Sequence, residues 1–350
     1  MKKWTMLFLL MLILLCAGWV VDLLWSAGQF KTIDSHFSGT CRPVEGIVGA
    51  EDITIHPTTG IAYISVCDRR AVGSGEPGNG GIFAYDMNTN GALPINLIPE
   101  ADPDFQPHGI SLYTGQDGQD ALFVVNHQGG NNTIEIFLLR DNRLVHQKTA
   151  ADAALVSPND LVGVGPEQFY VTNDHRHPGG FKRMVEEYAR QAWSNVLFYT
   201  GSEFVEAASG LGYANGINVS SDGRLLYVST TVERALHVYD RNPATHEISL
   251  MKKIDLSTGL DNIELDTAGR LYIAAHPKLL TFVKHSKDAA LLSPSQILSL
   301  EARTDGSYRV EEIYLDSGAE ISGSSVAAVS GNRMLIGAVF DPKFLDCRLD

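Results

Sequence analysis

The sequence predicts an all-β fold, a β-propeller preceded by an N-terminal signal or anchor helix, and three observations support this prediction. Short apolar runs rich in Val, Ile, Tyr and Phe recur from residue 44 onward, separated by Gly, Asp, Asn and Pro, as is typical of strands. A pattern of turn, strand, polar insertion and second strand returns roughly every 40–60 residues, which is the spacing of propeller blades. Helical periodicity is weak beyond the N-terminal segment.

The first 27 residues form a separate segment. Two lysines precede an apolar stretch from Trp4 to Val21, which is the pattern of an export signal or of an uncleaved membrane anchor. About 18 residues are just enough to span a bilayer, and Ser26-Ala27-Gly28 offers a small-residue cleavage site. We favour export with a retained anchor over cleavage. The protein is then expected to be anchored facing the periplasmic or extracellular side, or to be secreted.

The expected strands follow one pattern along the chain. Each is a short apolar run that begins after a turn signal such as Asp222-Gly223. They span residues 61–66, 82–86, 121–126, 133–139, 168–172, 195–199, 225–229, 236–239, 271–275, 279–283 and 333–340. One helix is expected at 180–192, where Met184 and Tyr188 recur at helical spacing. No shift in composition divides the chain, so residues 28–350 are expected to form a single propeller domain.

The charge balance argues against nucleic acid as a partner. The chain has 27 Lys and Arg residues against 41 Asp and Glu residues, a formal net charge of −14. Phosphate binding requires a basic face, which this composition does not favour. An acidic surface suits a solvated globular protein and, more weakly, a site for cations.

The cysteines outside the N-terminal segment number three: Cys41, Cys67 and Cys347. Two of them lie at opposite ends of the chain that follows the segment. In an oxidising compartment this placement suggests one disulfide that closes the fold end to end. Cys67 is then left over, and a buried free thiol is its default interpretation.

Familiar catalytic motifs are absent or out of context. Residues 73–78 match GxGxxG, but Pro77 interrupts this loop and a strand follows it. A dinucleotide site needs a strand before the loop and a helix after it. The sequence also lacks GxSxG, HExxH and CxxC motifs, which argues against a serine esterase or a zinc protease of known type.

Five segments place carboxylates, amides or a histidine at expected strand ends, each next to an apolar residue. They span residues 49–52, 107–111, 157–160, 213–217 and 259–263. In each, the polar side chain could point into a central channel while its neighbour packs in the core. Asp, Glu and Asn supply hard oxygen ligands, which suit calcium better than zinc or copper. Any one segment taken alone is better interpreted as an ordinary turn.

Taken together and in order, these segments resemble the paraoxonases, the animal arylesterases and lactonases. The most specific stretches are PHGISLY and LFVVNH (107–113 and 122–127), SPNDLVGVGPEQFYVTNDH (157–175), YANGINVSSDGRLLYVS (213–229) and SGSSVAAV…LIGAVF (322–340). The resemblance extends from Cys41 to Cys347. It implies a six-bladed propeller with two calcium ions in its central channel, and a disulfide between these two cysteines.

The resemblance also implies a set of ligands for each ion. The catalytic calcium would be held by Glu51, Asn159, Asn215, Asp261 and Asn262. The deeper, structural calcium would be held by Asp52, Asp160 and the backbone carbonyl of Ile110. Two carboxylates in the first set match the charge of the ion, and the amides add neutral oxygens.

His108 and His127 match the catalytic dyad proposed for that family, in which the first histidine, tuned by the second, takes a proton from the attacking water. Further residues match the active-site wall. They are Asp174, His175, Tyr213, His276 and Ser325. Arg70 stands where the animal enzymes carry a tyrosine, while Tyr213 and Ser325 stand where phenylalanine and threonine are frequent. These departures concern the pocket wall, so they affect substrate choice more than reaction class.

We therefore expect a calcium-dependent hydrolase of lactones and aryl esters, with a small lactone or ester as its partner and with the membrane contacted through the N-terminal segment. A second hypothesis is a sugar-lactone hydrolase of the gluconolactonase type, against which the segments around His108 and His127 argue. A third is a membrane-tethered propeller that keeps calcium for stability and acts only as a binding module. The full ligand set and the histidines argue against it, since a purely structural role needs only the deeper ion.

Overall fold

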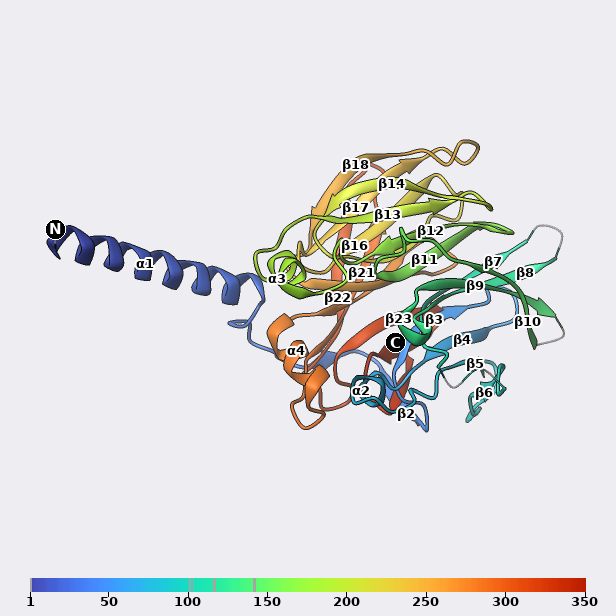
Figure 1. The fold of residues 1–350 in the computed structure, drawn as a ribbon. Coiled ribbons are helices and arrows are strands. Elements are labelled where there is room, and N and C mark those ends of the chain that lie inside the picture. Colours follow the sequence, from blue (N-terminus) through green and yellow to red (C-terminus); the bar gives the residue numbers. More distant parts are fainter. Residues whose placement is uncertain (1, 101, 103, 116–117, 141–142) are drawn as a thin grey trace.

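The protein folds as a six-bladed β-propeller, as expected. The computed structural model describes residues 2–100, 102, 104–115, 118–140 and 143–350. In this part of the chain, six antiparallel sheets stand around a common centre, and their innermost strands contact one another in a closed ring. In Figure 1 the sheets succeed one another in the order of the sequence, from blue to red.

Each blade begins with its innermost strand. Blade 1 contains β3 (Ala50–Ile55), β4 (Ile61–Val66), β5 (Gly81–Asp86) and β6 (Ile95–Asn96). Blade 2 contains β7 (Pro107–Thr114), β8 (Asp120–Asn126), β9 (Thr133–Arg140) and β10 (Arg143–Ala150). Blade 3 contains β11 (Pro158–Gly165), β12 (Gln168–Asn173), β13 (Ser194–Tyr199) and β14 (Phe204–Leu211).

The second half of the chain repeats the pattern, and two N-terminal strands join it. Blade 4 contains β15 (Ala214–Val219), β16 (Leu225–Thr230), β17 (Ala235–Arg241) and β18 (Ile248–Asp255). Blade 5 contains β19 (Gly259–Leu265), β20 (Leu271–His276), β21 (Ser295–Ala302), β22 (Tyr308–Asp316) and β1 (His36–Phe37). Blade 6 contains β23 (Ser324–Ser330), β24 (Arg333–Ala338), β25 (Lys343–Arg348) and β2 (Thr40–Glu45).

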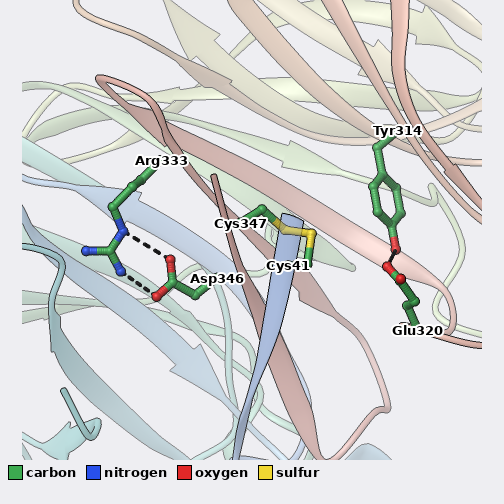
Figure 2. The surroundings of a disulfide bond; sticks show 6 residues. All are labelled: Cys41, Tyr314, Glu320, Arg333, Asp346 and Cys347. Carbon is green, nitrogen blue, oxygen red and sulfur yellow. Dashed lines mark hydrogen bonds and ion pairs between the residues drawn. A yellow bond between two sulfur atoms is a disulfide. The ribbon is translucent and has the colours of Figure 1, made fainter. Parts of the chain in front are cut away.

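The ring is closed by strand pairing between the two ends of the propeller. Strand β2 forms the outer edge of blade 6 and pairs with β25, so that Cys41 lies opposite Cys347. These two residues form a disulfide, which confirms the expected pairing (Figure 2). Cys67 is a buried free thiol. Apolar side chains from facing blades form the core between them, for example around Ile53 and Phe344 between blades 1 and 6.

The helices lie outside the sheets, and here two expectations were wrong. They are α1 (Lys2–Ser26), α2 (Arg69–Gly73), η1 (Gln128–Gly130), α3 (Gly180–Tyr188) and α4 (Leu279–Lys287). Residues 279–283, expected as a strand, form the first half of α4, because Leu279, Phe282 and Val283 follow the i, i+3, i+4 spacing of one helix face. Helix α3 ends before residue 192, since Arg190 has a positive φ of 51°.

Helix α1 projects from one end of the propeller, and α3 and α4 lie beside its base (Figure 1). It is long and apolar enough to cross a membrane. Its base is attached to the blades, since the N–H of Leu279 donates to the carbonyl of Ala27 at 3.0 Å. Asp22 also forms an ion pair with Arg190, just after α3. Together with the disulfide, this apolar helix is consistent with export.

Candidate active site

A cavity of about 480 Å³ opens at the end of the propeller from which α1 projects. Its floor comes from the first residues of five innermost strands. They are Glu51 on β3, His108 on β7, Asn159 on β11, Asn215 on β15 and Asp261 on β19. A larger hollow of about 1170 Å³ lies between the outer strands of blades 1 and 2, away from these side chains. We therefore place the candidate site in the smaller cavity.

Every innermost strand is irregular where it reaches this cavity. The pairing of β3 with β4 shifts between Ala50 and Asp52, and the first residues of β7, β11, β15, β19 and β23 show the same kind of shift. A bulge turns side chains away from the regular alternation of a strand. Consecutive polar residues such as Asp261 and Asn262 are therefore both buried at the end of the channel.

Two glycines allow the strands to approach closely at this level. A Cβ atom on Gly109 would lie 2.5 Å from the Cα of Asp160, and one on Gly216 would lie 2.6 Å from the Cα of Asn262. Both distances are too short for any side chain at these positions. The Gly in PHGIS and the Gly in YANGI are thus required by the packing of one blade on the next.

The five residues expected to hold the catalytic ion are brought together and are between 2% and 5% exposed. Their three amide nitrogens all donate to protein oxygens: Asn159 to Asp174 at 3.3 Å, Asn215 to Thr231 at 3.1 Å and Asn262 to Glu51 at 3.0 Å. The three amide oxygens and Oε2 of Glu51 have no hydrogen-bond partner among the described residues. Buried oxygens without partners are costly, and a bound cation would compensate for them.

The carboxyls in the channel are costly to ionise unless a cation lies beside them. Burial, followed by repulsion from Asp52 and Asp261, raises the pKa of Glu51 to about 8, although Arg69 opposes this shift. Burial likewise raises the pKa of Asp52 to about 7 and that of Asp160 well above its usual value. Within the described part of the chain, no three His, Cys, Asp or Glu side chains form a metal cluster. The candidate ligands of the catalytic ion are instead three amide oxygens and two carboxylates.

The residues expected around the deeper ion join neighbouring innermost strands. Oδ2 of Asp52 accepts the N–H of Ile110 at 2.7 Å, linking blade 1 to blade 2. Oδ2 of Asp160 accepts the N–H of Ile217 at 2.8 Å, linking blade 3 to blade 4. Repulsion from Asp52 contributes to the raised pKa of Asp160, so the two carboxylates lie close enough to interact.

The two histidines form a hydrogen-bonded pair beside Glu51. Nδ1 of His108 lies 2.9 Å from Nε2 of His127, whose Nδ1 lies 2.8 Å from Oδ1 of Asn132. The Asn132 amide nitrogen donates to the carbonyls of Leu155 and Val156 at 2.8 and 3.0 Å, so its oxygen must be the acceptor. Burial lowers the pKa of both histidines, which favours their neutral forms.

These contacts determine the tautomers. His127 must carry its proton on Nδ1 to donate to Asn132, so its Nε2 accepts. His108 then donates from Nδ1, and its Nε2 keeps an unprotonated lone pair. That nitrogen lies 3.7 Å from Oε1 of Glu51, and His108 lines the cavity. It is available as a base.

Three of the expected wall residues line the cavity: Asp174, Tyr213 and His276. Nε2 of His276 donates to Oδ2 of Asp261 at 2.8 Å, and the His276 ring stacks on Phe282 of α4, with ring centroids 3.7 Å apart. His175 lies behind the wall, between Asp174 and Glu187, and although burial alone lowers its pKa, these two partners raise it to about 9.

Arg70 and Ser325 also lie behind the cavity lining. Ser325 donates to the carbonyl of Glu51 at 2.6 Å. Arg70 turns toward α4, where it donates to the carbonyl of His285 at 2.7 Å. It also donates to the carbonyl of Phe340, after β24, at 3.1 Å. In place of Arg70, its neighbour Arg69 enters the cavity, with its guanidinium 3.8 Å from Glu51.

Sequence reasoning missed two residues of the site, Arg69 and Asn132. Arg69 is next to Arg70, which stands where the animal enzymes carry a tyrosine. This difference in the loop is the one signal in the sequence that points to Arg69 as well. Nothing in the sequence distinguishes Asn132 from Asn131 before it. Charged side chains of Glu187, Arg190 and Lys287 also line the cavity. An apolar part of the wall comes from α4, the loop after β24 and the base of α1. Its members include Leu23, Leu279, Phe282, Val339 and Phe340.

Comparison with known proteins agrees with this geometry. Residues 30–349 match the Arylesterase family model. Human serum paraoxonase/arylesterase 1 is 34% identical over 328 residues, and bovine serum paraoxonase/arylesterase 2 is 35% identical over 331 residues; the alignments cover 88% and 91% of both chains, respectively.

Solved structures show the same fold at much lower identity. A luciferin-regenerating enzyme superposes with a TM-score of 0.54 at 12% identity, over 89% of this chain and 95% of the other. Regucalcin from Agrobacterium tumefaciens superposes with a TM-score of 0.53 at 12% identity, over 91% and 98% of the two chains. By the family match and its curated relatives, the chain belongs to the arylesterase (paraoxonase) family and is a carboxylic ester hydrolase.

Proposed function

We propose that this protein hydrolyses lactones and aryl esters in a calcium-dependent reaction in which His108 is the general base. One observation supports this proposal most directly. The partly buried His108, whose Nδ1 lies against His127, shares a cavity with carboxylate and amide oxygens that have no other described partner. The family match makes esters the substrate class, and these groups supply the means to attack a carbonyl.

The donor set fits calcium. Glu51, Asn159, Asn215, Asp261 and Asn262 would hold the catalytic ion, since all five offer hard oxygens and four have an oxygen without a partner in the described chain. Asp52, Asp160 and the carbonyl of Ile110 would hold a second ion deeper in the channel. When bound, calcium supplies a positive charge that polarises the substrate carbonyl and stabilises negative charge on its oxygen.

The residues of the chain would carry the proton transfers. Nε2 of His108 takes a proton from water as the water oxygen bonds to the carbonyl carbon. When the tetrahedral intermediate collapses, the C–O bond of the ester breaks, and the same nitrogen returns the proton to the leaving oxygen. His127 stabilises the positive charge that His108 carries between these steps, because it accepts from its Nδ1–H. The products are an alcohol or phenol and a carboxylic acid, which then releases its proton to solvent as a carboxylate; with a lactone both groups are on one molecule.

The cavity wall favours apolar substrates. Leu279, Phe282 and Phe340 line the same cavity as the polar floor, and they would bury the acyl chain or the aryl ring while the carbonyl meets the floor. This arrangement supports hydrophobic lactones and aryl esters rather than sugar lactones.

We further propose that α1 is retained and anchors the enzyme in a membrane on the exported side. Leu23, Ser26 and Ala27, at the base of α1, line the cavity. The mouth of the active site would therefore lie next to the bilayer surface, where apolar substrates concentrate.

The test is turnover of phenyl acetate, a long-chain lactone and gluconolactone by the full chain in detergent, with calcium and with a calcium chelator. The full chain is needed because α1 contributes to the cavity. We expect the first two substrates to be hydrolysed and a chelator to abolish their turnover. Chelator-resistant turnover would contradict the mechanism, and turnover of gluconolactone alone would favour the gluconolactonase hypothesis. Calcium-dependent melting without any hydrolysis would indicate a binding module.

A further inference from the structure

Three arginines gather around a cavity of about 310 Å³ between the last blade and the first. Arg42, Arg333 and Arg348 come from β2, β24 and β25 of blade 6, and Asn90 comes from the turn after β5 of blade 1. The only acid that lines it within the described chain is Asp346. This excess of positive charge stands out in a chain whose net charge is −14.

The strand register places these side chains on one face of blade 6. Arg42 lies opposite Asp346, and Arg333 lies directly opposite Arg348. Asp346 and Arg348 are two residues apart on β25, so they share a face. Like charges directly opposite each other on neighbouring strands are destabilising unless something neutralises them.

Asp346 neutralises part of this charge. It pairs with Arg42 at 2.6 Å and with Arg333, and it accepts the hydroxyl of Tyr85 at 2.7 Å. Figure 2 shows the pair of Arg333 and Asp346 beside the disulfide. One carboxylate thus forms ion pairs with two guanidinium groups, so one positive charge of these two is not balanced. The side chain of Arg348 has no hydrogen-bond or ion-pair partner among the described residues, although it lines the same cavity.

We propose that this cavity, which we name the clasp pocket, binds a small oxoanion such as sulfate or phosphate. Guanidinium groups match the geometry of such anions and bind them through paired N–H donors. The anion would neutralise the facing Arg333 and Arg348 and would join blade 6 to Asn90 of blade 1. It would therefore stabilise the closure of the propeller, next to the Cys41–Cys347 disulfide.

The topology favours a soluble anion over a lipid headgroup. The catalytic cavity lies at the start of β23, and β24 runs antiparallel to β23. Arg333 begins β24 and Arg348 ends β25, so both lie at the opposite end of the strands from the cavity and from the base of α1. An anchor formed by α1 would hold the clasp pocket away from the bilayer.

The test is thermal unfolding of the full chain in detergent with sulfate, compared with chloride at equal ionic strength. Sulfate is used because calcium sulfate is far more soluble than calcium phosphate. We expect a saturable increase in Tm of about 3 °C or more at a large excess over Kd. In Arg348→Gln the half-saturating concentration should rise about tenfold, as expected for loss of a charged hydrogen bond. Arg303→Gln, an exposed change of the same charge outside the pocket, should behave as the natural protein does.

Sulfate also stabilises proteins through general exclusion from their surface, but that effect does not saturate and does not depend on Arg348. An equal, non-saturating response of all three proteins would overturn the proposal. Calorimetric titration of sulfate gives a second readout that does not depend on unfolding. Absence of saturable heat with the natural protein would overturn it as well. The side chain of Arg348 forms no hydrogen bond or ion pair with the described residues, and Gln can keep its backbone pairing in the sheet, so the variant is expected to fold.

Discussion

Oδ1 of Asn132 lies 2.8 Å from Nδ1 of His127, and this contact determines which nitrogen of His108 can accept a proton. Asn132 lies outside the cavity lining and is held by the carbonyls of Leu155 and Val156. The chemistry proposed for the dyad thus depends on the loop between β8 and β9, which carries Asn132, and on the loop that joins blades 2 and 3, which holds it.

Replacing Asn132 with Leu should lower kcat while leaving KM nearly unchanged. The variant keeps the volume of the side chain but removes the acceptor, so His127 no longer favours one tautomer and His108 is no longer oriented as a base. A loss of roughly tenfold to a hundredfold is expected for an outer residue that positions a catalytic group. Steady-state kinetics with phenyl acetate measure it. A variant that raised KM at constant kcat would show that Asn132 acts on substrate binding instead.

Replacing Arg70 with Met should weaken substrate binding, because Arg70 lies behind the apolar wall and holds it in place through its contacts. Its guanidinium lies 4.7 Å from the ring centroid of Phe340 and donates to the carbonyls of Phe340 and His285. Without it, Phe340 and α4 lose a common support. We expect KM for a long-chain lactone to rise roughly tenfold, with kcat within about twofold.

Arg70→Lys is the matched control, because it keeps the charge and can still reach one carbonyl. Its KM should lie between those of the natural protein and the Met variant. If the Met variant instead lost kcat at constant KM, Arg70 would act on the reaction centre rather than on the wall.

The contrast between Leu279–Lys287 and the strands shows what the sequence could predict. Blade strands such as Ile61–Val66 and Leu225–Thr230 were identified because a buried strand reads as a short apolar run between turns. The run at 279–283 is also short and apolar, but Leu279, Phe282 and Val283 fit the spacing of one helix face, and the segment folds as the first half of α4. A run of five apolar residues fits both the strand and the helix period, so its sequence alone does not decide between them.

The residues of the candidate site also fall into those that the sequence predicts and those that it does not. The expected ligands Glu51, Asn215 and Asp261 were found through ordered motifs, and the structure brings them into one cavity. Asn132 and Arg69 act through contacts that form only after distant loops meet. Their roles depend on side-chain direction, for which a single sequence carries no periodic signal. Arg70 is the opposite case. Its place in the sequence predicts a residue of the cavity wall, but its side chain points behind the wall, toward the carbonyls of Phe340 and His285.

Removing the disulfide should weaken the closure of the propeller without changing the reaction. The sequence separation between Cys41 and Cys347 is 306 residues, and a loop of this size predicts a loss of roughly 5 kcal/mol in the free energy of unfolding. Cys41→Ser with Cys347→Ser should therefore melt at a clearly lower temperature, as measured by calorimetry. Cys16→Ser, which changes an exposed free cysteine, is the control. Equal melting of both variants would show that strand pairing between β2 and β25 is sufficient.

Calcium binding should release protons and should strengthen as pH rises from 6 to 8. Without the ion, burial raises the pKa of Glu51 to about 8 and that of Asp52 to about 7, so both carboxyls retain protons near neutrality. The ion binds the ionised forms and must displace these protons. Calorimetric titration with calcium at pH 7, in buffers of different ionisation enthalpy, measures the protons released. Binding without proton release would contradict the raised pKa values.

The same carboxyls should make the stability of the calcium-free protein depend on pH. Their pKa values in the folded protein, about 8 for Glu51 and about 7 for Asp52, exceed those of unfolded chains, near 4. The folded state therefore binds more protons than the unfolded state in this range, and its stability falls as pH rises. With a chelator, Tm should decrease from pH 6 to pH 8, whereas with saturating calcium the decrease should disappear because the ion neutralises the ionised carboxylates. Parallel Tm profiles with and without calcium would mean that the ion binds elsewhere than beside Glu51 and Asp52.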